Sequence, residues 1–278
     1  MRKVLYLLLI LSLLTFPCEA KTPWSSKPPV GSVVDWSHPL SRGLVAVFLM
    51  NEGGGLKVRN LADSTFNKYS EILPGSTTNW ATSKRGKSIR DTGSNTTSYI
   101  TLGTTPVSIR NSCSIVMGYR KTDTTNRAAY AFGSLDNGAA SRIVCHLPYS
   151  DGTIYWDFGN ATEGDGRVSV AGLTFGNDIW CFIGSNGLHA IYQNGKLRAS
   201  NNSTKVLSSD YVLSILGIGN VASQYSDLAE YTFFYMYNRA LSPSEIQQLY
   251  IDPYCFIESP KPWYVTAVAT ARRIFMVN

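Results

Sequence analysis

The chain has 278 residues and a formal net charge of +6, with 44% hydrophobic and 16% charged residues. That length is sufficient to bury a sizeable core, and β-sandwiches of this size often form a single domain. The basic excess is mild and spread along the chain. This argues against a nucleic-acid partner, because proteins that bind nucleic acid concentrate Lys and Arg in a patch.

The first 20 residues have the pattern of an export signal. Arg2 and Lys3 precede an almost wholly apolar run over residues 4–16, and Ala20 supplies a small residue at the cleavage position. The run is shorter than the roughly 20 residues of a membrane span, although an uncleaved anchor is an alternative. We therefore expect a signal peptide over residues 1–20 and no transmembrane span after its removal. The mature protein would be secreted, at the cell surface or in the periplasm, or associated with a virion.

After the signal peptide, the chain is expected to begin with an extended lead-in and to continue as short strands. Prolines at positions 23, 28 and 29 mark residues 21–42 as the lead-in. Apolar runs separated by polar turns then predict an all-β antiparallel β-sandwich, and Pro148–Gly152 and Asn194-Gly195 are hairpin signals. The expected strands are Leu44–Met50, Tyr99–Leu102, Cys113–Tyr119, Arg142–Leu147, Thr153–Phe158, Ile179–Gly184, Leu188–Gln193, Lys196–Ala199, Val212–Ile218 and Tyr231–Tyr237.

The segment after the last of these strands predicts the one short C-terminal helix. Ser242 is a good N-cap, Pro243 suits the first helical position, and Glu245 completes a capping box. Asp252-Pro253 ends the helix, because the residue before a proline avoids helical dihedral angles. The tail over residues 253–278 contains two further apolar runs, Trp263–Val268 and Arg272–Val277. Either could pair with the edge of the sandwich or with a partner chain.

Several of these segments, in their order along the chain, resemble a known family. The turn Tyr237–Ser242, the strand Gly43–Phe48 with its turn Asn51–Gly55, the hairpin Ile191–Lys196 and the strand Leu216–Gly219 are similar to concanavalin A-like jelly rolls of the laminin-G-like group. The resemblance implies a jelly-roll domain over residues 43–252. It does not imply one function, since this fold hosts lectins, hydrolases and spacers.

The resemblance also implies a possible calcium site. Related jelly rolls often hold a structural Ca²⁺ between the turn after the first strand and the start of the last strand. Glu52 and Asp227 are the candidate ligands here, with Asn51 and Glu230 beside them. Carboxylates and loop carbonyls are the ligands that calcium prefers. No zinc site is expected from Cys and His spacing.

Four cysteines remain after the signal peptide, namely Cys113, Cys145, Cys181 and Cys255. An even number in an exported protein allows disulfides, with three possible connectivities. The first three lie inside apolar runs, where a cysteine thiol packs well as a small core residue. Both alternatives stay open at the level of sequence.

A search for catalytic motifs finds little. Glycosidases with this fold carry a Glu-x-Asp-x-x-Glu strand, which places two carboxyl groups on one face, and the chain has no such triplet. The nearest carboxylate pair, Glu163 and Asp165, lies in a Gly-rich turn. His38, His146 and His189 stand apart in the sequence, and the two in strands, His146 and His189, are expected to be packed or edge residues rather than bases. These observations predict that the chain is not an enzyme.

Carbohydrate recognition is the sharper functional hypothesis. Sugar faces stack on aromatic rings, and loop polar groups reach the hydroxyls. The candidate ligand-binding residues are Tyr149, Asp151 and Tyr225, because they fall in turns rather than in strands. Other loop candidates are Asn126, Arg127 and Gln224, whereas Trp156, Trp180, Phe234 and Tyr235 are expected to fill the core.

The expected function is therefore an exported, non-catalytic module that recognises a glycan or a cell-surface protein. A structural or assembly subunit, as in a phage virion or on a bacterial surface, is the alternative. It would dock or form a homo-oligomer through the tail. A glycoside hydrolase comes third.

Overall fold

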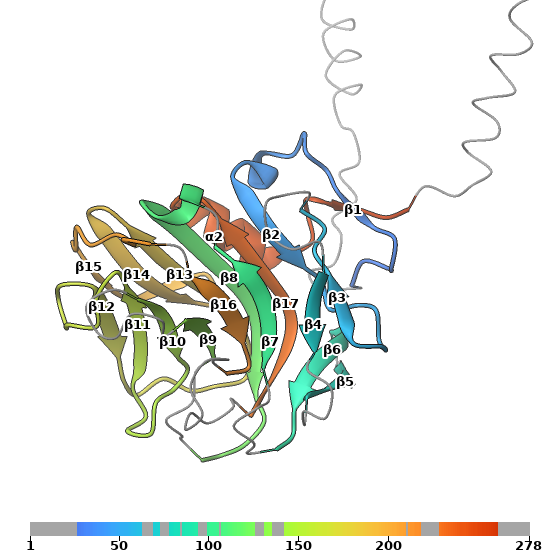
Figure 1. The fold of residues 1–278 in the computed structure, drawn as a ribbon, viewed down its shortest axis with the longest axis horizontal. Coiled ribbons are helices and arrows are strands. Elements are labelled where there is room, and N and C mark those ends of the chain that lie inside the picture. Colours follow the sequence, from blue (N-terminus) through green and yellow to red (C-terminus); the bar gives the residue numbers. More distant parts are fainter. Residues whose placement is uncertain are drawn as a thin grey trace, which may run out of the picture.

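The structure is a computed structural model that describes residues 27–62, 69–72, 78–83, 85–93, 99–105, 107–125, 131–134, 142–209, 211–217 and 228–260. The predicted signal peptide and the two predicted tail strands lie outside these residues. Antiparallel strands dominate the described chain, and Figure 1 shows them arranged as two curved sheets. The prediction of an all-β sandwich with one short α-helix is confirmed.

Sheet I is the eight-stranded sheet that carries the site described below. Its spatial order is β12 (Arg167–Val170), β11 (Ile154–Phe158), β10 (Ile143–His146), β9 (Phe132–Ser134), β16 (Val212–Ile215), β7 (Ile100–Thr104), β4 (Tyr69–Ile72) and β3 (Lys57–Arg59). Neighbouring strands pair antiparallel throughout, as the registers of β10 with β11 and of β11 with β12 illustrate.

Sheet II is the second eight-stranded sheet. Its order is β15 (Lys196–Asn201), β14 (Leu188–Gln193), β13 (Asn177–Ser185), β8 (Ser112–Lys121), β17 (Ala229–Tyr237), β6 (Gly86–Asp91) and β5 (Thr78–Ser83), with β2 (Leu44–Phe48) paired to β17. Two 3-10 helices, η1 (Pro39–Ser41) and η2 (Val107–Ile109), occur in connections.

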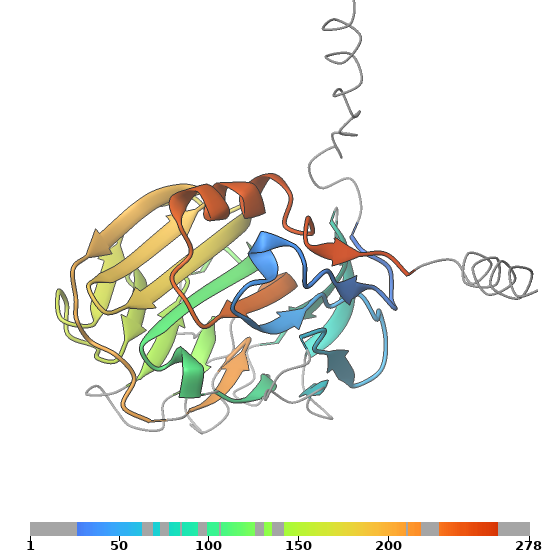
Figure 2. The same cartoon turned by 90° about the horizontal axis from the view of Figure 1, so that it is seen from above.

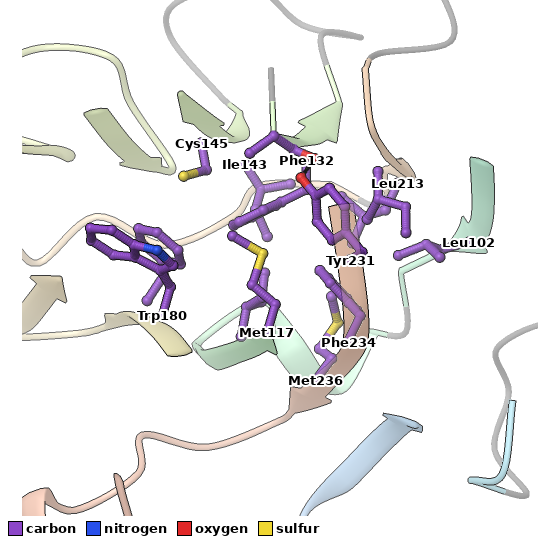
Figure 3. Packing of buried hydrophobic residues seen from close by; sticks show 14 of the residues in the cluster. Leu102, Met117, Phe132, Ile143, Cys145, Trp180, Leu213, Tyr231, Phe234 and Met236 are labelled. Atoms are coloured by element: carbon purple, nitrogen blue, oxygen red, sulfur yellow. Dashed lines mark hydrogen bonds between the residues drawn. The ribbon is translucent and has the colours of Figure 1, made fainter. Parts of the chain in front are cut away.

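The main hydrophobic core lies between the two sheets. Alternate residues of each strand face inward, because side chains in a strand point to opposite faces in turn. Figure 3 shows Met117 and Trp180 from sheet II packed with Phe132 and Ile143 from sheet I. Trp156 is fully buried in the same core, and its indole N–H donates to the carbonyl of Ile183 at 2.8 Å. The expectation that Trp156, Trp180, Phe234 and Tyr235 are buried is confirmed.

A bulge in β17 decides which aromatic residues enter this core. Pairing with β8 shifts register between Tyr231 and Phe233, so Tyr231 and Phe234 both face sheet I although they are three residues apart. Gly118 of β8 lies opposite the bulge. A Cβ at Gly118 would lie 2.1 Å from the Thr232 hydroxyl oxygen and 2.7 Å from the Phe233 ring. Only glycine therefore fits at position 118, opposite the bulge, without a shift of Thr232 and Phe233.

A second hydrophobic cluster covers the opposite face of sheet II. Helix α2 (Pro243–Ile251) contributes Ile246 and Leu249, which pack with Tyr235 and Phe256. Figure 2 shows α2 and the chain that follows it lying across this face. The predicted capping box is present, with the Ser242 side chain accepting from the Glu245 backbone N–H and the Glu245 side chain accepting from the Ser242 backbone N–H.

Residues before β2 and after α2 pair with each other. Strand β1 (Val33–Val34) forms an antiparallel two-stranded sheet with β18 (Ile257–Glu258). The predicted lead-in therefore lies beside the segment that follows the helix, and Val34 and Ile257 join the second cluster. No helix among the described residues is long and apolar enough to cross a membrane.

Both predicted hairpin turns join adjacent antiparallel strands. Pro148–Gly152 connects β10 to β11, and Asn194-Gly195 connects β14 to β15, with positive φ angles of 53° and 75° at the two turn residues. Such angles are required by the tightest hairpin turns, which is why Asn-Gly predicts them well.

The four cysteines are thiols, with Cys113, Cys145 and Cys181 buried and Cys255 half-buried. Burial raises the pKa of the Cys113 and Cys181 thiols above its ordinary value, so both stay protonated. Of the two alternatives left open by the sequence, the structure therefore has free thiols and not disulfides at these four cysteines.

Candidate functional site

The outer face of sheet I carries a polar cluster on β10, β11 and β12. In β11, Trp156 and Phe158 point into the core, so the alternate residues Tyr155 and Asp157 point outward. The registers place His146 of β10 opposite Tyr155, and Arg167 of β12 opposite Asp157. Three adjacent strands therefore bring together a histidine, a tyrosine, an aspartate and an arginine that are distant in sequence.

Asp157 is the anchor of this cluster. Its carboxylate is fully buried and receives N–H donors from two arginines. Arg142 donates from Nε to Oδ2 at 2.8 Å, and its Nη2 contacts the same oxygen. Arg167 donates from Nε to Oδ1 at 2.6 Å and from Nη2 to Oδ2 at 2.8 Å. These charge-assisted bonds fix both guanidinium groups, and the bond to Asp157 raises the pKa of Arg167 further.

The turn between β10 and β11 supplies the next wall of the site. The Tyr149 backbone N–H donates to the carbonyl of Thr153 at 2.8 Å, and the Gly152 N–H donates to the carbonyl of Tyr149 at 2.9 Å. Asp151 accepts from the Thr153 N–H at 2.8 Å and from the Tyr155 hydroxyl at 2.8 Å. The turn is thus held to β11 through its own hydrogen bonds, which position Tyr149 and Asp151.

The hydrogen bonds of Asp151 change two pKa values. The bonds from Thr153 and then Tyr155 lower the pKa of the Asp151 carboxyl, which is exposed to solvent and is therefore ionised at neutral pH. The same carboxylate raises the pKa of the Tyr155 hydroxyl, which therefore remains a donor to it. The pair forms a fixed acidic edge beside the two arginines.

Between these walls lies a pocket of about 250 Å³ that is open to solvent and lined by Arg142, His146, Tyr149, Tyr155 and Arg167. The three rings meet edge to face, with centroid distances of 4.8 Å for His146–Tyr149 and 5.9 Å for Tyr149–Tyr155. The Arg167 guanidinium carbon lies 4.5 Å from the centre of the Tyr155 ring. The pocket therefore combines aromatic surface with guanidinium donors, and we call it the Arg–Tyr pocket.

The structure brings together two of the three predicted ligand-binding residues. Tyr149 lines the Arg–Tyr pocket, and Asp151 lies at its edge through its bond to Tyr155. Tyr225 lies outside the described residues, as do Asn126, Arg127 and Gln224. Sequence reasoning missed Arg142, Tyr155 and Arg167. The alternation along β11, where Tyr155 and Asp157 alternate with apolar residues, could have indicated Tyr155, whereas no local pattern indicates the two arginines.

The place expected for calcium contains a lysine ammonium group. Lys27 Nζ donates to the carbonyl oxygens of Met50, at 3.0 Å, and of Lys87. The pKa of Lys27 falls to about 7 because burial disfavours its charge, while Glu52 and Glu230 raise it in opposition. Glu52 also accepts the Arg59 backbone N–H at 2.7 Å, and Glu230 pairs with Arg120.

The described residues of this place do not fit a calcium ion, because the Lys27 amine interacts electrostatically with Glu52 and Glu230, the described carboxylates that would have to bind it. The second candidate ligand, Asp227, lies outside the described residues. Within the described residues, no group of three or more His, Cys, Asp or Glu side chains could hold a metal ion.

The remaining candidates from the sequence have structural roles. The His189 ring lies 3.2 Å from the carbonyl oxygen of Gly166 and 3.1 Å from that of Lys205, and burial lowers its pKa. His38 caps η1 by accepting from the Leu40 N–H. Glu163 and Asp165 lie in the turn before β12, where Asp165 is 3.4 Å from Lys205 Nζ.

Comparisons with known proteins bear on the fold. No family model matches the chain, and no curated protein matches it either. Similar solved structures include Trypanosoma rangeli sialidase in complex with sialic acid, with a TM-score of 0.57, 13% identity, and coverage of 90% of this chain and 39% of that one. Domain 4 of AbnA, an extracellular arabinanase from Geobacillus stearothermophilus, in complex with arabinotriose, gives a TM-score of 0.54, 20% identity, and coverage of 74% and 97%.

A third similar structure is the binding domain of Paraclostridial Mosquitocidal Protein 1, with a TM-score of 0.54, 16% identity, and coverage of 75% of this chain and 52% of that one. At these identities the similarity shows a shared β-sandwich fold and nothing finer. The chain spans 39% of the length of the sialidase it resembles. The jelly-roll expectation is supported, and the laminin-G-like assignment remains a proposal.

The sialidases correct the prediction that the chain is not an enzyme. They are enzymes, and they align with 86 to 90% of this chain at 12 to 13% identity. The prediction from the sequence that the chain is non-catalytic is therefore wrong. A missing local carboxylate motif is an insufficient reason for it, because catalytic groups can assemble from strands and loops that are far apart in sequence.

Proposed function

We propose that the chain is a laminin-G-like jelly roll that recognises carbohydrate through the Arg–Tyr pocket. One observation carries the proposal, namely that two tyrosine rings and a histidine ring share one solvent-open pocket with two guanidinium groups. Aromatic rings supply a face or an edge for the apolar side of a sugar, and N–H donors reach its oxygen atoms. The AbnA domain and the sialidase, both in complex with sugars, support the proposal through their fold.

The size of the pocket suits a short ligand. Pockets for drug-sized molecules start at roughly 300 Å³, so a volume of about 250 Å³ matches one or two sugar units better than a buried oligosaccharide. The open side would leave the rest of a glycan chain in solvent. Secretion or display on a surface, as the N-terminal signal predicts, would place the pocket where such chains occur.

A glycan-array screen of the purified protein, run with calcium and again with EDTA, tests the proposal. We expect selective binding to one sugar class, with equal signals in both buffers because the described residues do not fit calcium. A blank array from a folded, soluble protein would contradict carbohydrate recognition. A signal that is lost in EDTA would contradict the conclusion that the described residues do not fit a calcium ion.

A glycoside hydrolase is the second candidate function, favoured by the similarity to sialidases. Incubating the protein with each glycan that it binds, and following reducing ends by mass spectrometry, separates the two. Release of product supports the hydrolase, whereas an unchanged glycan leaves recognition as the function. The assembly alternative rests on the tail over residues 253–278, of which residues 261–278 lie outside the described residues. Deletion of residues 260–278 followed by size-exclusion chromatography tests it.

A further inference from the structure

We propose that the ligand of the Arg–Tyr pocket is an acidic sugar, whose carboxylate contacts Arg142 and Arg167. This inference rests on the proposed function and adds the chemical class of the ligand. It follows from the charges that line the pocket, from the donors left on the two guanidinium groups, and from the position of Asp151.

The charges around Asp157 do not balance. Two guanidinium groups contact one carboxylate, and three of the four contacts converge on Oδ2. One arginine would be sufficient to neutralise one aspartate. Asp151 and Glu163 are the other carboxylates near the pocket, and among the described residues neither forms an ion pair with Arg142 or Arg167. The second guanidinium charge therefore has no carboxylate of its own in direct contact, and because the two side chains are only 13% and 21% exposed, water screens it poorly. An anion in the pocket would complete the neutralisation.

Both guanidinium groups retain donors for such an anion. Each has five N–H donors, and Asp157 takes those on Nε and on one side of Nη2. As far as the described residues show, the Nη1 amino group of each arginine is left for a ligand. Because Asp157 fixes the planes of both groups, little side-chain entropy would be lost on binding.

The acidic edge of the pocket gives the ligand a direction. The ionised Asp151 carboxylate accepts from the Tyr155 hydroxyl, whereas the two arginines are bonded to Asp157. It would repel a carboxylate but accept hydrogen bonds from sugar hydroxyls. An acidic sugar would therefore place its carboxylate toward the arginines, its hydroxyls toward Asp151, and its ring against Tyr149 and Tyr155.

Matched pairs of sugars that differ only in charge test this inference. We would titrate the protein calorimetrically with trigalacturonic acid and its methyl ester, and with sialyllactose and lactose. We expect the acid of at least one pair to bind roughly tenfold to a hundredfold more tightly than its neutral partner, the range of a charged hydrogen bond. The preference should shrink as sodium chloride is raised.

Variants of the two arginines test whether the preference for the acidic sugar arises in the Arg–Tyr pocket. Arg142→Gln and Arg167→Gln should each reduce the acid-to-neutral ratio at least tenfold, and because acid and ester are measured on the same variant, a loss common to both sugars cancels in this ratio. Arg42→Gln, which removes the same charge from an exposed position outside the pocket, is the matched control. Thermal unfolding shows whether each arginine variant is folded. If a variant is unfolded, the affinities of the wild-type protein for the acid and for its methyl ester are sufficient to test the inference.

The outcomes separate this inference from the proposed function. Equal binding of acid and ester, or array binding confined to neutral sugars, would overturn the acidic ligand while recognition of carbohydrate stands. An equal loss in Arg42→Gln would also overturn it, because the preference would then report net charge. No binding to any array glycan would remove the proposed function itself.

Discussion

Arg167 holds both carboxylate oxygens of Asp157, through N–H donors at 2.6 Å and 2.8 Å. This bidentate contact joins two adjacent strands on the outer face of sheet I, and it orients the guanidinium group over the Tyr155 ring. One pair of side chains therefore does two things, since it neutralises a fully buried carboxylate and presents a cation to the Arg–Tyr pocket.

Removal of the carboxylate should destabilise the protein. In Asp157→Ala, two guanidinium groups would face each other without the anion that separates their charges, so the free energy of unfolding should fall by roughly 3 kcal/mol or more. Urea unfolding measures this. Asp165→Ala is the matched control, because Asp165 is half-exposed in a turn and its loss should change stability by less than about 1 kcal/mol. Equal effects of the two variants would contradict the role given to Asp157.

Loss of the Tyr155 hydroxyl should change the titration of its neighbour. In Tyr155→Phe the pKa of Asp151 should rise toward its ordinary value but not reach it, because the stronger bond from the Thr153 backbone N–H remains. Carboxyl carbon NMR against pH measures this shift. Tyr250→Phe, a half-buried tyrosine of α2, is the control that should leave Asp151 unchanged.

Gly184 should tolerate no side chain. A Cβ at this position of β13 would lie 2.2 Å from the Phe158 ring, which packs across the sandwich from sheet I. Gly184→Ala should therefore lower the free energy of unfolding by roughly 1 to 3 kcal/mol through overpacking. Gly54→Ala is the control, since nothing lies within 4 Å of its would-be Cβ. Equal unfolding midpoints for the two variants would show that sheet I and sheet II are not in contact at this point.

Lys27 should give the protein a distinct pH dependence. Its pKa is lowered to about 7 in the folded protein from 10.5, so above pH 7 the unfolded chain binds a proton that the folded chain does not. Stability should therefore rise with pH from 7 toward 10.5, by at most about 1.4 kcal/mol per pH unit from this group.

Comparison with Lys27→Met isolates this contribution from other titrating groups. Between pH 7 and pH 9 the stability of the wild type should rise relative to that of the variant, as measured by urea unfolding at each pH. A difference that stays constant over this range would show that the Lys27 amine keeps its ordinary pKa.

The sequence predicted those features that depend on neighbouring residues. The Asn194-Gly195 turn and the Ser242–Glu245 capping box are local, since each hydrogen bond closes within a few residues. Tyr149 and Asp151 could be chosen because a turn between two strands frees its side chains from the core. The thiol state of the cysteines was left open, because it depends on which strands become neighbours.

The rest of the site depends on register, which local patterns do not contain. Arg167 meets Asp157 only because β12 pairs with β11 at that position, and β12 has no apolar run that would have indicated a strand. The bulge between Tyr231 and Phe233 is equally hidden, because the aromatic-rich segment Tyr231–Tyr237 looks the same in sequence with or without it. A missing motif likewise gave the wrong prediction about catalysis.

The most direct test of the account is the affinity of the Tyr149→Ala variant for the glycan that gives the strongest array signal. Tyr149 lies in a turn and is half-buried, so its truncation should leave the protein folded, with a modest fall in the unfolding temperature from the lost ring contacts with His146 and Tyr155. Loss of one stacking ring should weaken binding at least tenfold, by calorimetric titration. Unchanged affinity in a folded variant would contradict the central claim, because the glycan would then bind somewhere other than the Arg–Tyr pocket.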